Sequence, residues 1–141
     1  MRRSVTTGPA RGFTLLELLV VMVIIGLLAG FVAPRYFAQI GKSQAKAARA
    51  QITALEQALE QFRIDTGRFP TNEEGLDALM TPPPGLTEWA GPYLKKAAPS
   101  DPWGRPFVYS NPGAHGEIDL SSYGKDGRAG GTGDNADITN W

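Results

Sequence analysis

The apolar residues of this chain are concentrated in one unbroken stretch near the N-terminus, residues 13–33. The stretch reads FTLLELLVVMVIIGLLAGFVA and contains a single charged residue, Glu17. As a helix it would be roughly 31 Å long, which is enough to cross the hydrocarbon core of a bilayer. Three basic residues precede it: Arg2, Arg3 and Arg11. Because basic residues tend to stay on the cytoplasmic side of a membrane, we expect residues 13–34 to form a transmembrane helix and residues 1–12 to lie in the cytoplasm.

After Pro34 the apolar residues become periodic instead of continuous. Five of them are spaced by four, three, four and three positions: Ala48, Ile52, Leu55, Leu59 and Phe62. This spacing places them on one face of a helix, which we expect to pack against the rest of the chain. Gly67 suits the left-handed position that follows a helix. One helix is therefore predicted from about Thr14 to about Ile64.

The predicted helix has two parts of different character. Residues 13–34 are apolar all round and need lipid, or other copies of the chain, around them. Residues 35–66 are amphipathic. Pro34 lies at the junction, and because it lacks a backbone N–H it should kink or locally loosen the helix.

Residues 67–141 are rich in turn-forming residues and predict a small globular body. Thr71 and Glu74 have the spacing of a capping box, which predicts a short helix that reaches Met80. Three short strands are expected: about Arg105–Ser110, about Glu117–Ser121 and about Ala136–Asn140. The fold class is therefore α+β, with a long N-terminal helix packed on a small antiparallel sheet.

Composition narrows the chemistry that this chain can perform. The 141 residues include 14 basic and 14 acidic residues, one histidine and no cysteine. Without cysteine the chain has no disulfide, thiolate zinc site or cysteine nucleophile. The single histidine, His115, excludes metal sites that need two histidines. The balanced charge gives no reason to expect nucleic acid as a partner.

Glu17 needs an explanation because an acid inside a membrane helix costs on the order of 2.5–3.5 kcal/mol. No basic residue lies within one or two helical turns after it. A cut between Gly12 and Phe13 would create an amine four residues before Glu17, and this amine could pair with Glu17 of the same or a neighbouring chain. A secretory signal peptide fits less well, because the apolar stretch is too long and lacks small residues before Pro34. A simple membrane anchor leaves Glu17 unexplained.

The segment from Gly12 to Glu17, GFTLLE, resembles the recognition site of type IV prepilin-like proteins. In both, a short basic leader ends in glycine, phenylalanine follows, and glutamate comes four residues later. The resemblance implies that a prepilin peptidase in the inner membrane cuts after Gly12 and N-methylates Phe13. It also implies that Glu17 neutralises the amine of an adjacent subunit during assembly. Gly26 and Gly30 form a G-x-x-x-G pattern, which permits close approach of helices in the filament core.

A second segment narrows the resemblance. Residues 101–109, DPWGRPFVY, resemble the C-terminal body of the major pseudopilins of type II secretion systems, as do the dipeptides that follow at Pro112, His115 and Asp119. The resemblance implies a single-pass protein of the bacterial inner membrane whose body is periplasmic and whose copies form a helical filament there. Its implied partners are the prepilin peptidase, the minor pseudopilins and the inner-membrane assembly platform with its ATPase.

Two related families are the nearest alternatives. Type IV pilins usually close their C-terminal region with a disulfide, which a chain without cysteine cannot form. Minor pseudopilins fit less well, given the segment around Trp103 and the glycine-rich segment that follows it.

Residues 122–137, SYGKDGRAGGTGDNAD, form a segment rich in glycine and acid. With five glycines it cannot fold by burying apolar surface, so something must hold it in place. Oxygen ligands without nitrogen or sulfur suit a hard cation, and a flexible loop suits Ca²⁺ better than Mg²⁺. The spacing matches neither an EF-hand nor a calcium-binding β-helix repeat, so from the residues alone a solvated loop remains the alternative.

The resemblance adds one calcium ion per subunit, bound in a loop at about residues 120–138. The expected ligands are the side chains of Asp126 and Asp134 and backbone oxygens at Tyr123 and Arg128. Three further candidates lie in the same loop: Ser122, Asn135 and Asp137. Such an ion would make folding of the body dependent on calcium.

Two functions of other classes remain to be compared. One is a membrane-tethered hydrolase with a histidine, a serine and an acid: His115, Ser121 or Ser122, and Asp119. No nucleophile-elbow motif surrounds these serines, so we expect a structural protein and not an enzyme. A generic calcium-binding membrane module is the other alternative, and it predicts no need for Glu17.

Overall fold

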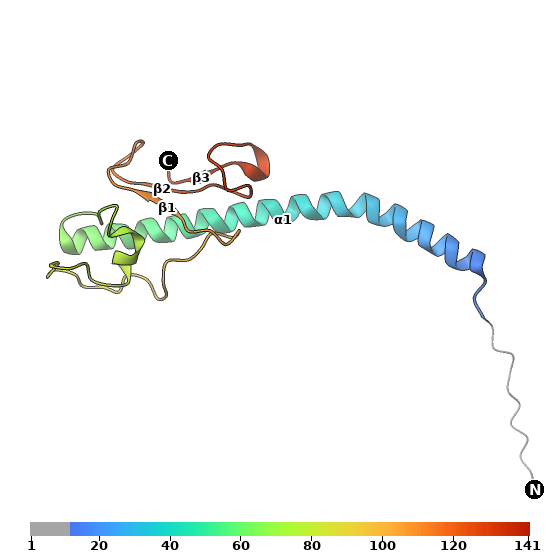
Figure 1. Cartoon of the computed structure of the whole chain (residues 1–141), viewed down its shortest axis with the longest axis horizontal. Helices are drawn as coiled ribbons and strands as arrows, with labels where there is room; N and C mark the ends of the chain where they lie inside the picture. The colour runs from blue at the N-terminus through green and yellow to red at the C-terminus, as the bar shows by residue number, and fades with distance from the viewer. Residues whose placement is uncertain (1–11) are drawn as a thin grey trace, which may run out of the picture. The chain divides into compact units, whose positions relative to one another are not determined.

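The computed structural model describes residues 12–141, and the predicted leader arginines lie outside the described residues. The chain divides into two compact units, one that ends at Phe37 and one that spans Ala38–Trp141. The elements follow the expected order (Figure 1). They are α1 (Leu15–Thr66), η1 (Gly75–Leu79), β1 (Val108–Ser110), β2 (Asp119–Ser122), η2 (Gly133–Asn135) and β3 (Ile138–Thr139), where η denotes a 3₁₀ helix.

The N-terminal unit consists largely of the first part of α1. Every residue from 12 to 37 is exposed, including the whole predicted transmembrane stretch. Among the described residues, α1 is the single helix that is long and apolar enough to cross a membrane. Pro34 lies inside α1, which continues through it. Pro34 therefore does not end the helix, and the kink or loosening expected there stays a prediction.

The amphipathic part of α1 carries the core of the C-terminal unit. The predicted apolar face is buried, with each residue 1 % exposed or less: Ala48, Ile52, Leu55, Leu59 and Phe62. It packs against Leu79 of η1 and Leu120 of β2, both of which are fully buried. The helix ends at Thr66, two residues beyond the prediction, and Gly67 follows with a φ of 78°. The N–H of Gly67 donates to the carbonyl of Arg63 at 2.8 Å, so the left-handed cap forms as expected.

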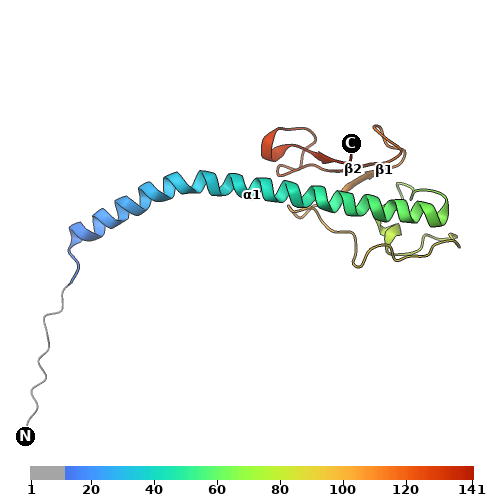
Figure 2. The same cartoon turned by 180° about the vertical axis from the view of Figure 1, so that it is seen from behind.

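The three strands form one antiparallel sheet in the order β1-β2-β3. Tyr109 of β1 is paired with Leu120 of β2, and Ser121 of β2 with Thr139 of β3. Both views show the sheet along one side of the second half of α1 and η1 along the other (Figures 1 and 2). Leu120 of β2 is fully buried in the core, and Ser121 and Ser122, which follow it, are buried as well.

The first and last strands are shorter than the sequence predicts. Arg105 is not in β1, because its N–H donates to the carboxylate of Asp101 and its carbonyl accepts from the Asp101 N–H, which closes a turn. Pro106 cannot donate to a ladder. At the other end, the side-chain oxygen of Asn140 accepts from the N–H of Leu120 at 2.8 Å, so a side chain replaces a backbone bond of β3. β2 begins at Asp119, two residues after the predicted start, and ends one residue after the predicted end, at Ser122.

The predicted capping-box contacts form in the turn immediately before η1, which begins at Gly75. The N–H of Glu74 donates to Thr71 Oγ1 at 3.2 Å, and the N–H of Thr71 donates to Glu74 Oε2 at 2.8 Å. The element that follows is a single 3₁₀ helix that ends at Leu79, one residue before the predicted end.

Candidate functional site

The start of α1 is built around a reciprocal contact between Thr14 and Glu17. Glu17 Oε2 accepts from the Thr14 N–H at 2.8 Å and from the Thr14 hydroxyl at 3.1 Å. In return, Thr14 Oγ1 accepts from the N–H of Glu17 at 3.1 Å. This is a capping box, and its Thr-x-x-Glu spacing is visible in the sequence, although we did not predict it there. Glu17 therefore has hydrogen-bond partners within its own chain before any cut is made.

The predicted cleavage site lies immediately before this capping box. Gly12 and Phe13 are not helical, and both are exposed, with Phe13 88 % accessible. Because α1 begins only at Leu15, the bond between them is outside the hydrogen-bonded helix. A peptidase can bind an exposed, non-helical bond in an extended form without first unwinding a helix.

The glycine-rich loop, residues 122–137, connects β2 to β3 and contains η2. Its five glycines all have positive φ, between 62° and 95°. This backbone is open to glycine and strained for most other residues. Two backbone contacts draw its ends together: the Lys125 N–H donates to the Asp134 carbonyl at 3.4 Å, and a Cβ at Gly124 would lie 2.6 Å from the Ala136 carbonyl oxygen.

The acids predicted as calcium ligands are spread over this loop. Asp126 Oδ1 accepts from the N–H of Arg128 at 3.2 Å, and Asp137 Oδ2 accepts from the N–H of Gly130 at 2.8 Å. Asp134 lies against α1 instead, where a Cβ on Gly41 would be 2.5 Å from both of its carboxylate oxygens. No group of three acids or histidines that could hold a metal occurs within residues 12–141.

The other candidates differ in what they can offer to a cation. Asp137 Oδ1 is buried and has no hydrogen-bond partner within the described part of the chain. A buried carboxylate oxygen without a partner is costly. The Ser122 hydroxyl is already committed, because it donates to Asp101 Oδ2 at 2.6 Å. Asn135 lies in η2 and is exposed. The chemistry of these oxygens suits a hard cation such as Ca²⁺, and one of them, Asp137 Oδ1, lacks a partner among residues 12–141, although the acids are not gathered into one cluster there.

Two residues outside the loop hold it, and we did not predict either of them. Asp101 is 4 % exposed and accepts from the N–H groups of Trp103 and Arg105 as well as from Ser122. The guanidinium of Arg105 donates to the carbonyls of Gly124 at 2.6 Å and Lys125 at 2.9 Å. The sequence DPWGR gives a weak local signal for this turn. An aspartate side chain often accepts a hydrogen bond from the backbone N–H two residues later, which forms an Asx turn. Which loop it would hold is not visible in the sequence.

His115 has a partner, but it is not a serine. Its Nδ1 lies 2.9 Å from Asp119 Oδ2, and its ring stacks on Trp141 at 4.0 Å between centroids. Desolvation acts to raise the pKa of Asp119, but hydrogen bonds from the His115 ring and two backbone N–H groups outweigh it and lower that pKa. Ser121 and Ser122 are buried at 8 % and 1 % exposure. The structure thus joins two members of the hypothetical triad and directs the Ser122 proton to Asp101 instead.

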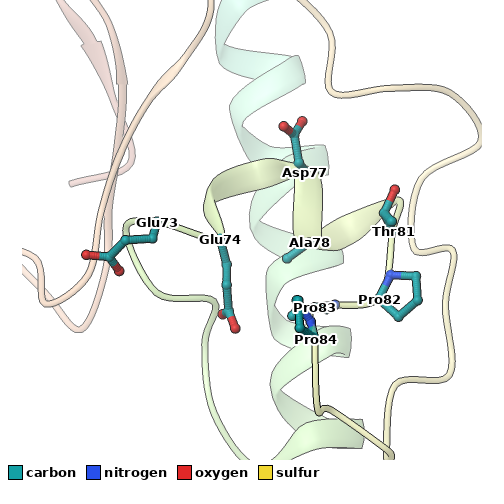
Figure 3. Close-up of a pocket in the computed structure, with 8 residues that line it drawn as sticks. All are labelled: Glu73, Glu74, Asp77, Ala78, Thr81, Pro82, Pro83 and Pro84. Carbon is teal, nitrogen blue, oxygen red and sulfur yellow. The ribbon is translucent and has the colours of Figure 1, made fainter.

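A surface cavity lies beside η1, away from the predicted site residues (Figure 3). Ala78, Pro83 and Pro84 form its apolar part, and Glu73 and Asp77 point outward on different sides. Glu74, which also lines it, is held by two hydrogen bonds of 2.7 Å from the guanidinium of Arg68. This salt bridge, chiefly through the hydrogen bond itself, lowers the pKa of Glu74. The cavity contains no histidine, and its lining residues have a structural explanation in the capping box and the proline stop.

Comparison with known proteins agrees with the geometry at both ends of the chain. The family model described as type II secretion system protein G matches residues 35–141, and the prokaryotic N-terminal methylation motif matches residues 9–33. The type II secretion system core protein G of Vibrio cholerae is 44 % identical over 133 residues, which cover 92 % of this chain and 90 % of that protein. Its namesake in Escherichia coli K12 is 45 % identical over 139 residues, which cover 96 % and 93 %.

A solved structure agrees with the fold as well. The crystal structure of the major pseudopilin from the type 2 secretion system of enterohaemorrhagic E. coli is 35 % identical in sequence, with a TM-score of 0.60. The match covers 74 % of this chain and 92 % of that one. Together these matches span both the membrane helix and the C-terminal unit. The chain therefore belongs to the type II secretion system protein G family, and it is similar in structure to a solved major pseudopilin of such a system.

Proposed function

We propose that this chain is the structural subunit that polymerises into the periplasmic pseudopilus of a type II secretion system. The observation that carries the proposal is the exposed apolar surface of residues 13–33, which follows a methylation motif. A surface of this kind is stable in lipid, or against copies of itself, and not in water. The match to the type II secretion system protein G family supports the proposal that the filament works in a type II secretion system.

The precursor enters the inner membrane with residues 1–12 in the cytoplasm and the C-terminal unit in the periplasm. A prepilin peptidase then cuts between Gly12 and Phe13 and methylates the new amine. In the mature chain Glu17 neutralises the amine of an adjacent subunit as subunits leave the bilayer. Pro34 removes one backbone hydrogen bond and so kinks or loosens the helix where the filament core ends. The exposed, non-helical Gly12–Phe13 bond and the capping box at Thr14 support this sequence of events.

Assembly needs partners that this chain does not supply. The sequence has no phosphate-binding loop, so ATP hydrolysis belongs to the assembly platform's ATPase. Minor pseudopilins complete the filament, and the growing filament pushes folded proteins toward the outer-membrane channel. The match to the type II secretion system protein G family, together with the absence of cysteine, favours this function over that of a type IV pilin.

We further propose that one Ca²⁺ holds the glycine-rich loop, in the place where a pilin has a disulfide. Asp137 is a strong candidate, because its Oδ1 is buried and has no hydrogen-bond partner among residues 12–141. Asp126 is the other, because its carboxylate is exposed in the same loop and accepts only from the Arg128 N–H within those residues. Backbone oxygens at Tyr123 and Arg128 remain candidates. Asp134 would have to leave Gly41 or bind from that position. The ion would be bound by several of the loop's carboxylate and carbonyl oxygens at once, which would hold together parts of a segment that its glycines leave flexible.

Mass spectrometry of the mature protein, purified from its own membrane, tests the proposal directly. The expected N-terminus is Phe13 carrying one methyl group, with residues 1–12 absent. An N-terminus at Met1 in assembled filaments, or a cut after Ala33 that releases a soluble body, would contradict it. A Gly12→Ser variant, which adds a side chain at the cut site, should accumulate as the uncut precursor.

A further inference from the structure

The segment from Asp101 to Arg105 is a rigid turn at the base of the glycine-rich loop. Two hydrogen bonds join Asp101 and Arg105: the Asp101 N–H donates to the Arg105 carbonyl at 2.7 Å, and the Arg105 N–H donates to the side-chain Oδ1 of Asp101 at 2.8 Å. Gly104 sits between them with a φ of 85°. The second carboxylate oxygen of Asp101 accepts from Ser122, the first residue of the loop. The buried charge of Asp101 is therefore fully satisfied, and the turn is tied to the end of β2.

The side chain of Arg105 extends from this segment to residues 124–127, at the start of the glycine-rich loop. Its Nη1 donates to the Gly124 carbonyl at 2.6 Å, and its Nη2 donates to the Lys125 carbonyl at 2.9 Å. A Cβ at Gly127 would lie 2.6 Å from Cζ and Nε of the same guanidinium. One planar group thus contacts three of the four residues from 124 to 127. Its five donors have a fixed fork geometry that an ammonium group cannot reproduce.

This arrangement is unusual for a loop expected to hold a cation. Arg105 carries a permanent positive charge, and by charge alone it would weaken the binding of a second cation nearby. It also occupies two of the carbonyl oxygens that could otherwise turn toward an ion. Its position makes sense if it fixes the backbone of a segment that five glycines leave flexible. The two effects have opposite signs, so they can be separated by experiment.

We propose that Arg105 is a positioning residue, which orders residues 124–127 through its paired bonds to the Gly124 and Lys125 carbonyls so that the rest of the loop can bind a cation. The inference rests on the proposed calcium site for its effect on affinity. Its effect on loop order stands without it. Asp101 supports Arg105 by closing the turn that aims it.

The test compares two substitutions of Arg105 in the full chain in detergent. Arg105→Gln removes the charge and the fork, and Arg105→Lys keeps the charge and removes the fork. Lys125→Gln is the matched control, because it removes one positive charge from an exposed side chain of the same loop. Calcium affinity is measured by calorimetric titration, and amide hydrogen exchange of residues 124–128 is followed with and without a chelator. Terbium luminescence lifetimes in H₂O and D₂O count the waters bound to the ion.

We expect both Arg105 variants to bind Ca²⁺ about tenfold or more weakly, the size typical for loss of a group that orients a ligand. Both should exchange the 124–128 amides faster and admit an additional water to bound terbium. Lys125→Gln should bind calcium as tightly as the unaltered chain or more tightly. A tighter affinity in Arg105→Gln, or unaltered exchange and affinity in Arg105→Lys, would overturn the proposal, because charge would then be the whole effect.

The result also separates this inference from the calcium proposal. If the unaltered chain binds no Ca²⁺ and no terbium, the calcium proposal fails. Exchange of residues 124–128 in chelator then decides the role of Arg105 alone: faster exchange in both Arg105 variants supports it, and equal exchange in all three chains refutes it. Thermal unfolding of each variant confirms that the core built on α1 remains folded.

Discussion

At the scale of single residues, Glu17 has one observed partner, Thr14, and one proposed partner in an adjacent subunit. Before cleavage its carboxylate accepts from Thr14, at the first turn of α1. After the proposed cleavage, its proposed partner is the new N-terminal amine of Phe13 in an adjacent subunit. The capping box lowers the cost of placing this acid in an apolar helix, because the carboxylate is hydrogen-bonded and lies at the positive end of the helix dipole.

Replacement of Glu17 separates insertion from assembly. Glu17→Ala removes an acid from an apolar stretch, so membrane insertion should be unaltered or improved. Filament assembly should be lost, because the amine of the neighbouring subunit keeps no partner. Thr14→Ala is the control, since it removes the capping hydroxyl and leaves the carboxylate in place, and it should retain most of the assembly. Membrane fractionation and electron microscopy of filaments give the two readouts. Normal filaments from Glu17→Ala would show that the acid serves the helix start alone.

At the scale of elements, α1 is one helix with two environments. Its first part is exposed throughout, and its second part buries a face against η1 and the sheet. This difference follows from composition, since an apolar helix has no polar face to turn toward water. The short elements of the C-terminal unit depend instead on particular side chains. η1 is held by the Thr71–Glu74 capping box and by Arg68.

The pH dependence of stability tests the contacts of Glu74. Because the folded pKa of Glu74 is lowered, chiefly by the hydrogen bond from Arg68, its stabilisation is present above the unfolded value of about 4.3 and is lost as the pH falls through the folded pKa. Glu74→Gln should lower the free energy of unfolding at pH 7 by about 1 kcal/mol, since the pair is partly exposed. The difference should shrink toward zero near pH 3.

Glu73→Gln is the control for that measurement. Glu73 is adjacent to Glu74 and exposed, and among the described residues it makes no salt bridge. Its substitution should leave stability within about 0.5 kcal/mol at both pH values. Denaturant unfolding of the full chain in detergent, followed by tryptophan fluorescence, measures both variants. A cost for Glu74→Gln that stays the same from pH 7 to pH 3 would assign it to packing and not to the charge.

At the scale of the whole molecule, the glycine-rich loop is the part of the C-terminal unit with the least apolar burial. Most of its residues are exposed, and its contacts are polar: Asp134 on Gly41, Asp137 with Gly130, and Arg105 under the first turn. A small unit of this kind has a modest core. A metal ion that binds only the folded loop adds its binding free energy to the stability of the whole unit.

Removal of calcium tests that coupling. Chelation should lower the unfolding temperature of the unaltered chain by several degrees, and Asp126→Ala should lower it similarly. Chelation should then have no further effect on Asp126→Ala, because the site is already lost. Asp77→Ala, which removes an exposed acid outside the loop, should keep the full response to chelation. An Asp126→Ala chain that still loses stability in chelator would place the ion elsewhere.

Much of the fold could be predicted because the signals for it are local. The apolar run of 13–33 and the periodic face from Ala48 to Phe62 are each contained within one helix, so spacing alone reveals them. A capping box is defined by two residues three positions apart, such as Thr71 and Glu74, so it can also be recognised from a short stretch of sequence. The ends of the strands were predicted less well, because Arg105 and Asn140 use bonds to Asp101 and Leu120 that compete with the ladder.

The sequence by itself determined the long apolar helix, the N-terminal methylation motif, the amphipathic face and the glycine- and acid-rich loop, since each depends on residues near one another in the chain. Only the tertiary structure decided which of the loop's oxygens are occupied. Ser122 meets Asp101 across 21 positions and Arg105 meets Gly124 across 19, and Asp134 rests on Gly41 of the helix. Such contacts form only after the sheet has packed on α1, because the two residues of each pair are far apart in the sequence and the fold alone brings them within contact distance.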